Sequence, residues 1–130
     1  MHVLSTLAQK GGSGKTVLAS NIARTFQLLG NDVLIVDSDP QHSISDWAET
    51  SEEPAMPRAV DVDGPVVHEL LPQVTGYDLA VVDGAGKIDG MSESIIRASD
   101  LVLIPIQPAS VEMWAVGEMV DLIEKYRDAS

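Results

Sequence analysis

The fold is decided by the stretch Lys10-Gly11-Gly12-Ser13-Gly14-Lys15-Thr16, which joins two segments of different hydrophobic period. Before this stretch, residues 2–8 alternate loosely and are rich in residues that favour strands. After it, apolar side chains recur at helical spacing in one stripe that ends before Gly30-Asn31: Leu18, Ile22, Phe26 and Leu29. The sequence therefore predicts a strand, a glycine loop and a helix in that order.

Strand-like and helix-like segments continue to alternate along the rest of the chain. Residues 32–37 and 77–83 are short apolar runs that end in acids, which is typical of parallel strands covered on both faces. Two further strands are expected at 58–62 and 101–106. Helices are expected at 44–47, 65–74, 92–98 and, after the cap Ser110, along the stripe Val111, Ala115, Met119, Leu122 and Tyr126. This alternation predicts one α/β domain over residues 1–130, a three-layer sandwich whose mostly parallel sheet has helices on both faces.

The composition fits a domain with an ordinary core and excludes several classes of protein. The chain has 130 residues, and 45% of them are hydrophobic. Twenty acidic and eight basic side chains give a net charge of -12, which repels nucleic acids and anionic membrane surfaces, so we expect neither as a partner of this chain alone. The absence of cysteine excludes disulfides, cysteine-held zinc, iron–sulfur clusters and a thiol nucleophile. No targeting signal is visible, and a cytoplasmic location is expected.

Three acids follow the ends of predicted strands, as the glycine loop does. Asp37 and Asp39 follow the second strand, and Asp83 ends the strand at 77–83. Parallel sheets bind ligands at the carboxyl ends of their strands, so these groups are expected at one site. Other interpretations stay open, because D-S-D-P is also good turn chemistry and Asp83 could end a strand without contacting a metal.

The glycine loop matches the phosphate-binding pattern G-x-x-x-x-G-K-[ST] except at its first position, where the chain has Gln9. Glycines let backbone N–H groups curl around a phosphate, and the following helix adds positive potential at its N-terminus. We expect Lys15 to reach the terminal phosphates of a nucleotide and Thr16 to offer its hydroxyl to Mg²⁺. A flexible glycine turn without a ligand is the structural alternative.

Four motifs in this order resemble those of the ParA/MinD class of P-loop ATPases. Residues 10–16 resemble the deviant Walker A motif, and residues 37–41 (D-S-D-P-Q) resemble the D-x-D-P-Q segment of ParA-type proteins. Residues 77–86 are similar to the Walker B strand with its following switch, and residues 100–108 to the next strand of the family. The whole is similar to the small, ParF-like partition ATPases, and it implies a P-loop NTPase-like fold.

The resemblance also implies a role for each matching residue. Lys10 matches the signature lysine, which crosses a nucleotide-sandwich dimer to the partner's phosphates. Lys15 and Asp39 match the phosphate-binding lysine and the acid that positions the attacking water, so Lys10, Lys15 and Asp39 are the catalytic candidates. ATP would be held by Lys10, Gly11, Gly12, Ser13, Gly14, Lys15, Thr16 and Val17. The metal Mg²⁺ would lie near Thr16, Asp37 and Asp83.

The function implied is that of an ATP-dependent homodimer that hydrolyses ATP slowly and moves plasmids or chromosomes together with a centromere-binding partner protein. Members of the family also bind DNA non-specifically, but the acidic composition of this chain gives little support to DNA binding. Association with the nucleoid is expected only if the full-length protein binds DNA. Two alternatives stay open: a MinD-like positioning ATPase, and a truncated binding module that does not hydrolyse ATP. The chain is expected to lack the C-terminal part that is usual in the family.

Overall fold

A five-stranded sheet of parallel strands forms the centre of the computed structural model, in the order β3-β2-β4-β1-β5. The strands are β1 (His2–Ala8), β2 (Val33–Ser38), β3 (Arg58–Asp61), β4 (Leu79–Ala85) and β5 (Leu101–Leu103). The helices are α1 (Lys15–Leu28), α3 (Val67–Leu70), the short 3-10 helix η1 (Leu71–Gln73), α4 (Gly90–Ala98) and α5 (Met113–Arg127). The structure describes residues 1–8, 15–40, 44, 57–85, 89–105 and 113–127.

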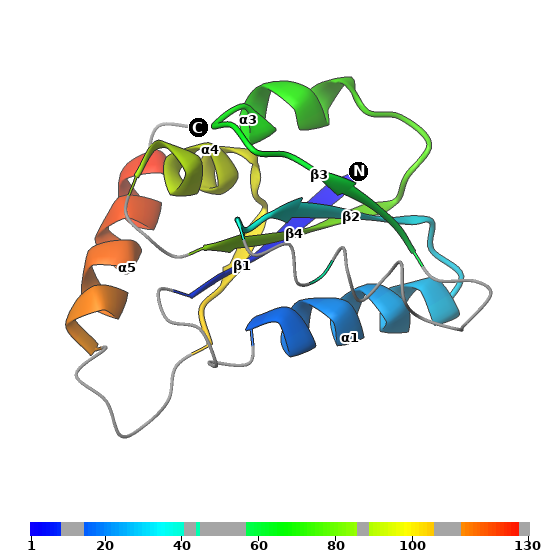
Figure 1. The fold of residues 1–130 in the computed structure, drawn as a ribbon, viewed down its shortest axis with the longest axis horizontal. Coiled ribbons are helices and arrows are strands. Elements are labelled where there is room, and N and C mark those ends of the chain that lie inside the picture. Colours follow the sequence, from blue (N-terminus) through cyan, green and yellow to red (C-terminus); the bar gives the residue numbers. More distant parts are fainter. Residues whose placement is uncertain (9–14, 41–43, 45–56, 86–88, 106–112, 128–130) are drawn as a thin grey trace.

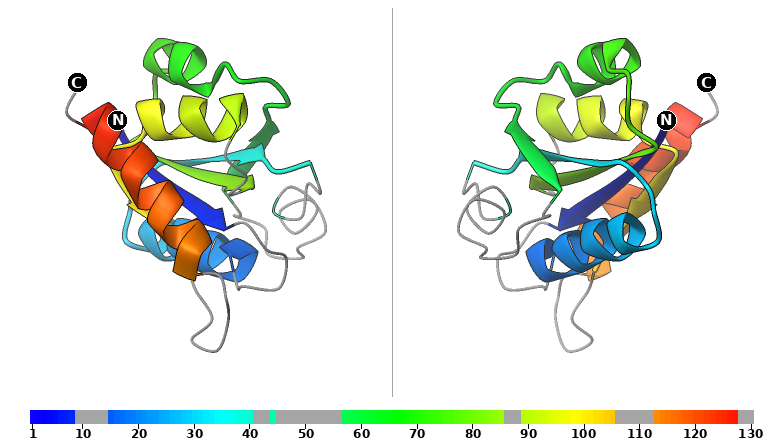
Figure 2. Two further views of the ribbon diagram at one scale, coloured as in Figure 1. Left: turned by 90° about the vertical axis from the view of Figure 1, so that its left-hand side faces the viewer. Right: turned by 90° about the vertical axis from the view of Figure 1, so that its right-hand side faces the viewer.

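Helices cover both faces of this sheet (Figures 1 and 2). Among the helices that the structure describes in full, α1 lies against one face together with Ile44, while α3, α4 and α5 lie on the other side. The strands alternate accordingly: Ile35 and Val81 pack in the cluster under α1, whereas Val36 and Val82 pack in the cluster under α3 and α4. The predicted three-layer sandwich with a parallel sheet is confirmed.

The apolar stripe predicted for α1 is wrong at its far end. Phe26 is 39% exposed and Leu29, one residue beyond the helix, is 71% exposed, whereas Ala19 and Ala23 are fully buried. Small alanine side chains let this face of the helix lie close to the sheet. The helix therefore packs through its alanines, and the larger apolar side chains at its far end stay exposed. Lys15 lies in the same buried row, one helical turn before Ala19, so the face that packs on the sheet also carries the lysine of the glycine loop.

Several predicted boundaries change for local reasons. Helix α3 begins at Val67 and gives way to η1 after Leu70, because Pro72 has no N–H with which to continue an α-helix. Helix α4 begins early, at Gly90, since the Asp89 carboxylate accepts hydrogen bonds from two backbone N–H groups of its first turn. Strand β5 ends at Leu103, three residues before the predicted end. The predicted helix at 44–47, apart from Ile44, and the cap Ser110 lie outside the described residues.

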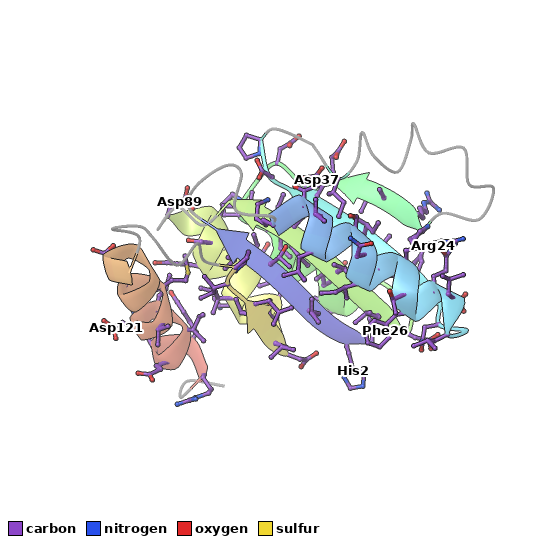
Figure 3. The ribbon with its side chains drawn as sticks, turned by 90° about the horizontal axis from the view of Figure 1, so that it is seen from below. His2, Arg24, Phe26, Asp37, Asp89 and Asp121 are labelled. Carbon is purple, nitrogen blue, oxygen red and sulfur yellow. The ribbon has the colours of Figure 1, made fainter. Side chains whose placement is uncertain are left out.

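The interpretation of α5 is confirmed where its side chains are described. Met119 is buried and Leu122 is half-buried, and both pack in the cluster under α3 and α4. Tyr126 donates a hydrogen bond to Glu93 Oε2 at 3.2 Å, which ties α5 to α4. Asp121 points away from the sheet into solvent (Figure 3). None of the helices in the described part of the chain combines the length and apolar character that crossing a bilayer requires.

A side chain at Gly84 is expected to displace its neighbours, because the side chains of Ile95 and Leu7 cover β4 closely there. A Cβ at this position would lie 2.4 Å from Ile95 Cδ1 and 2.9 Å from Leu7 Cδ2. We expect Gly84→Ala to lower the free energy of unfolding by about 1–3 kcal/mol, the usual cost of overpacking. Urea unfolding measures this difference.

Two further variants make the test specific to the contact with Ile95. Adding Ile95→Val removes Cδ1, so the double variant should lose less stability than the sum of the two single changes. Gly64→Ala is the control, because a Cβ there meets no atom within 4 Å. Additive losses at Gly84 and Ile95 would contradict the overpacking argument.

Candidate functional site

The strand register brings three polar side chains together at the carboxyl edge of the sheet. Asp37 of β2 lies opposite Asp83 of β4, and Asp83 lies opposite Thr6 of β1. All three residues are fully buried, with 0% exposure. Figure 3 places Asp37 beside the start of α1, with Asp89 at the same edge and His2 at the opposite one. The predicted convergence of strand-end acids is confirmed for Asp37 and Asp83.

Lys15 is the counter-ion of two of the predicted acids. Its Nζ donates to Asp39 Oδ2 at 2.6 Å and to Asp83 Oδ1 at 2.7 Å. The lysine side chain is only 9% exposed, and that of Asp39 is 14% exposed. Charges removed from water in this way persist only when they are paired and hydrogen-bonded. Within the part of the chain that the structure describes, Lys15 is thus the cation that contacts both of these desolvated carboxylates.

Asp37 forms a turn, and the turn places Asp39. The Asp37 carboxylate accepts a hydrogen bond from the backbone N–H of Asp39 at 3.1 Å, which is the geometry of an Asx turn. The turn interpretation of D-S-D-P is confirmed at Asp37, and this turn brings the Asp39 carboxylate to Lys15, whereas a role of these acids in a nucleotide site stays a prediction.

Hydroxyl groups hold the two oxygens of Asp83. Thr6 Oγ1 donates to Oδ1 at 3.1 Å, and Thr16 Oγ1 donates to Oδ2 at 3.3 Å. Burial raises the pKa of Asp83, and the charge and hydrogen bond of Lys15 and the hydroxyl of Thr6 oppose that effect. The neighbouring charge of Asp37 raises the pKa further. Among the neighbouring side chains, Lys15 therefore opposes the rise in the pKa of Asp83 most strongly.

The donor set fits a magnesium ion bound together with phosphates. Thr16 Oγ1 and Asp83 Oδ2 are adjacent oxygens, and Mg²⁺ takes oxygen ligands. Within the described residues, no three His, Asp or Glu side chains form a cluster that could hold a metal ion. A magnesium site of the usual kind needs no such cluster, because one or two carboxylates act there together with phosphate oxygens.

Part of the predicted site lies beyond what the structure describes. Lys10, Gly11, Gly12, Ser13 and Gly14 lie outside the described residues, so their phosphate contacts stay predictions. Among the groups in contact with Asp83, sequence reasoning missed Thr6. The feature that could have identified Thr6 is its position on β1, directly opposite Asp83 at the end of β4. This pairing is known only once the order of the strands is known.

Comparison with known proteins agrees with this geometry. Residues 4–126 match the family model described as the CobQ/CobB/MinD/ParA nucleotide binding domain. The chain belongs to this family. Maintenance of carboxysome distribution protein A from Gloeobacter kilaueensis is 34% identical over 120 residues, which cover 92% of this chain and 55% of that protein. Protein ParA of Rhizobium radiobacter is 27% identical over 131 residues, which cover 99% of this chain and 59% of that protein. The chain thus spans little more than half the length of these relatives.

Solved structures share the fold of this CobQ/CobB/MinD/ParA domain. The apo form of McdA from Cyanothece superposes with a TM-score of 0.79 at 18% identity, covering 100% of this chain and 68% of that one. A plasmid partition protein of Borrelia burgdorferi bound to AMPPNP gives a TM-score of 0.73 at 17% identity, covering 97% of this chain and 71% of that one. Cobyrinic acid a,c-diamide synthase of Mycobacterium smegmatis, with bound ADP and magnesium, gives a TM-score of 0.75 at 18% identity. The superposition covers 98% of this chain and 68% of that one.

Val17 follows the Lys15-Thr16 pair directly and lies 65% exposed at the start of α1. Valine keeps its backbone N–H but offers no side-chain hydrogen bond to a phosphate. We expect Val17→Thr to tighten ATP binding about fivefold, the scale of one hydrogen bond worth about 1 kcal/mol. Isothermal titration of both proteins with ATP measures the change, and equal affinities would contradict it.

Proposed function

We propose that the chain is the core of a ParA-type ATPase that binds Mg-ATP, dimerises and slowly hydrolyses ATP to position a cargo. The observation that carries this proposal is the contact of Lys15 with Asp39 and Asp83 beside Thr16. These are the side chains that phosphoryl transfer requires: a cation for the phosphates, an acid for the water and oxygen ligands for a metal.

Each side chain has a definite task in the proposed reaction. Lys15 exchanges its contacts with Asp39 and Asp83 for contacts with the phosphate oxygens of ATP. Asp39, released from Lys15, orients the attacking water and takes up its proton. A bond forms between the water oxygen and the γ-phosphorus, and the bond to the bridging oxygen breaks, giving ADP and phosphate. Magnesium, when bound, neutralises phosphate charge beside Thr16 and Asp83.

Dimerisation is the most direct test of the mechanism as a whole. Lys10 is proposed to reach the phosphates of a partner subunit, so the dimer should form with Mg-ATP and not with Mg-ADP. Sedimentation of the purified chain with each nucleotide measures this, and Lys10→Ala should remain a monomer in both. A monomer with ATP, despite measurable nucleotide binding, would overturn the sandwich dimer.

The cargo is proposed to be a plasmid or chromosome, recognised through a centromere-binding partner protein. A second cargo has support from the relatives, since two proteins named for carboxysome distribution are 34% and 30% identical to this chain. Fluorescence microscopy of a labelled protein that carries this domain distinguishes the two cargoes. A DNA cargo predicts cytoplasmic protein that lies over the nucleoid and moves with segregating DNA, whereas the second cargo predicts protein that follows carboxysomes. Retention on lipid vesicles would instead favour a MinD-like positioning ATPase.

A non-hydrolysing binding module is the remaining alternative. The two are separated by phosphate release from ATP. Release that disappears in Lys15→Ala or Asp39→Ala supports the ATPase, whereas binding of ATP without any release supports the module.

A further inference from the structure

The two oxygens of the Asp83 carboxylate face different neighbours. Oδ1 accepts from Thr6 Oγ1 at 3.1 Å and from Lys15 Nζ at 2.7 Å, while Oδ2 faces Thr16 Oγ1 at 3.3 Å. On the basis of the proposed function, we infer that Thr6 is a positioning residue: it holds Oδ1 so that Oδ2 stays directed at Thr16, where the magnesium ion of Mg-ATP would bind.

Thr6 is unusually placed for a polar side chain. It has 0% exposure, and the cluster beneath α1 contains Leu4, its neighbour on the same face of β1. A hydroxyl costs free energy in such surroundings unless it has a partner. Its shorter contact is to Asp83 Oδ1, and the longer one is to the carbonyl oxygen of Val82 at 3.4 Å. The partner of the buried hydroxyl is therefore the carboxylate.

Thr6 is also a donor to Asp83 that the paired strands hold in place. Strands β1 and β4 pair in register along their whole length, from His2 opposite Leu79 to Ala8 opposite Ala85. The β-branched side chain of threonine has restricted χ1 freedom, so its hydroxyl is held by a paired backbone. Lys15, in contrast, carries its donor on a long flexible side chain.

This difference matters once a nucleotide is bound. In the proposed function Lys15 turns to the phosphates, and Oδ1 loses its shortest contact. Thr6 stays in place because it belongs to the sheet. The carboxylate then keeps the orientation in which Oδ2 lies beside Thr16, and oxygen ligands at the right positions are what Mg²⁺ requires.

The test separates metal-dependent from metal-independent nucleotide binding. ATP affinity is measured by isothermal titration in the presence of EDTA and again with Mg²⁺, for the wild type and for Thr6→Val, which keeps the shape but removes the hydroxyl. We expect similar affinities in EDTA, and a gain on adding Mg²⁺ that is about tenfold smaller for Thr6→Val, the scale of one hydrogen bond to a charged group. Thr6→Ser should restore most of the gain.

Controls make each outcome decisive. Thr25→Val changes an exposed threonine of α1 and should leave both affinities unchanged. Should Thr6→Val not fold, as judged by circular dichroism, Thr6→Ala carries the same expectation. The role of Thr6 would be overturned if Mg²⁺ raised the ATP affinity of wild type and Thr6→Val equally, or if Thr6→Val lost the same ATP affinity in EDTA and in Mg²⁺. Either result would leave the proposed function standing. A wild type that binds no ATP under either condition would overturn the proposed function, and the role of Thr6 with it.

Discussion

Replacing Lys15 with methionine is expected to lower the free energy of unfolding by about 3–5 kcal/mol, the range for removing one partner of a buried ion pair. Methionine has a similar length but no charge, so Asp39 and Asp83 lose the cation that contacts them at 2.6 and 2.7 Å. Asp83 is fully buried and cannot turn to water instead. Urea unfolding at neutral pH without nucleotide measures the loss.

The pH dependence of this loss identifies its origin. Burial raises the pKa of Asp83 and Lys15 lowers it, so the Lys15→Met change raises that pKa further. A carboxyl with a higher pKa in the folded state contributes stability below its unfolded pKa, and this contribution disappears as pH rises through the folded pKa. The difference in stability between wild type and variant should therefore shrink as pH falls from neutral toward the ordinary aspartate pKa of about 3.9.

A surface lysine provides the matched control. Lys125 is exposed on α5, 5.5 Å from the ring of Tyr126, and Lys125→Met should change stability by less than about 0.5 kcal/mol. The Lys15 variant is also expected to show no ATP hydrolysis above background. A stability loss for Lys15→Met as small as that for Lys125→Met, or one that does not vary with pH, would refute the buried ion pair.

Asp39→Asn is expected to slow ATP hydrolysis by about a hundredfold or more, the usual effect of losing a general base. The amide cannot take up the proton of the attacking water. ATP binding should persist or tighten, because a neutral amide competes less with phosphate for Lys15 Nζ than the carboxylate now 2.6 Å away. Phosphate release measures the rate, and isothermal titration measures the affinity.

Asp89→Asn is the matched control for this charge change. Asp89 lies at the same edge of the sheet (Figure 3), where its carboxylate caps α4 through Met91 and Ser92. Asparagine caps helices about as well as aspartate, so hydrolysis should continue at the wild-type rate. Equal rates in wild type and Asp39→Asn would remove Asp39 from the reaction, whereas loss of both binding and hydrolysis would point to a structural role.

The order of the elements and the meeting of the acids could be predicted from the sequence. Continuous apolar runs that end in Asp37 and Asp83 indicated parallel strands, and parallel strands place their carboxyl ends on one edge. The register confirms this, since the two aspartates lie directly opposite each other. The glycine pattern likewise identified Lys15 as a residue of the site, and Lys15 contacts Asp83 and Asp39.

The packed face of α1 and the partners of Asp83 could not be predicted in this way. The hydrophobic period favoured Phe26 as a core residue, but the helix packs on the sheet through Ala19 and Ala23. Which face of a helix packs depends on the tertiary structure, and the hydrophobic period alone does not determine it. Thr6 is remote in sequence from Asp83, and its role depends on β1 lying beside β4. Contacts across a sheet follow from strand order, which a single sequence does not contain.

The position of β1 in the sheet has a consequence for the synthesis of the chain. This first strand lies between β4 and β5, and Ser5 pairs with both Val82 and Val102. Its neighbours are thus made long after it, and such distant pairing imposes a large loop-closure entropy and slows folding. While the ribosome adds the intervening residues, an apolar strand remains unpaired and open to aggregation. Chaperone binding during translation is therefore expected to concentrate on the residues of β1.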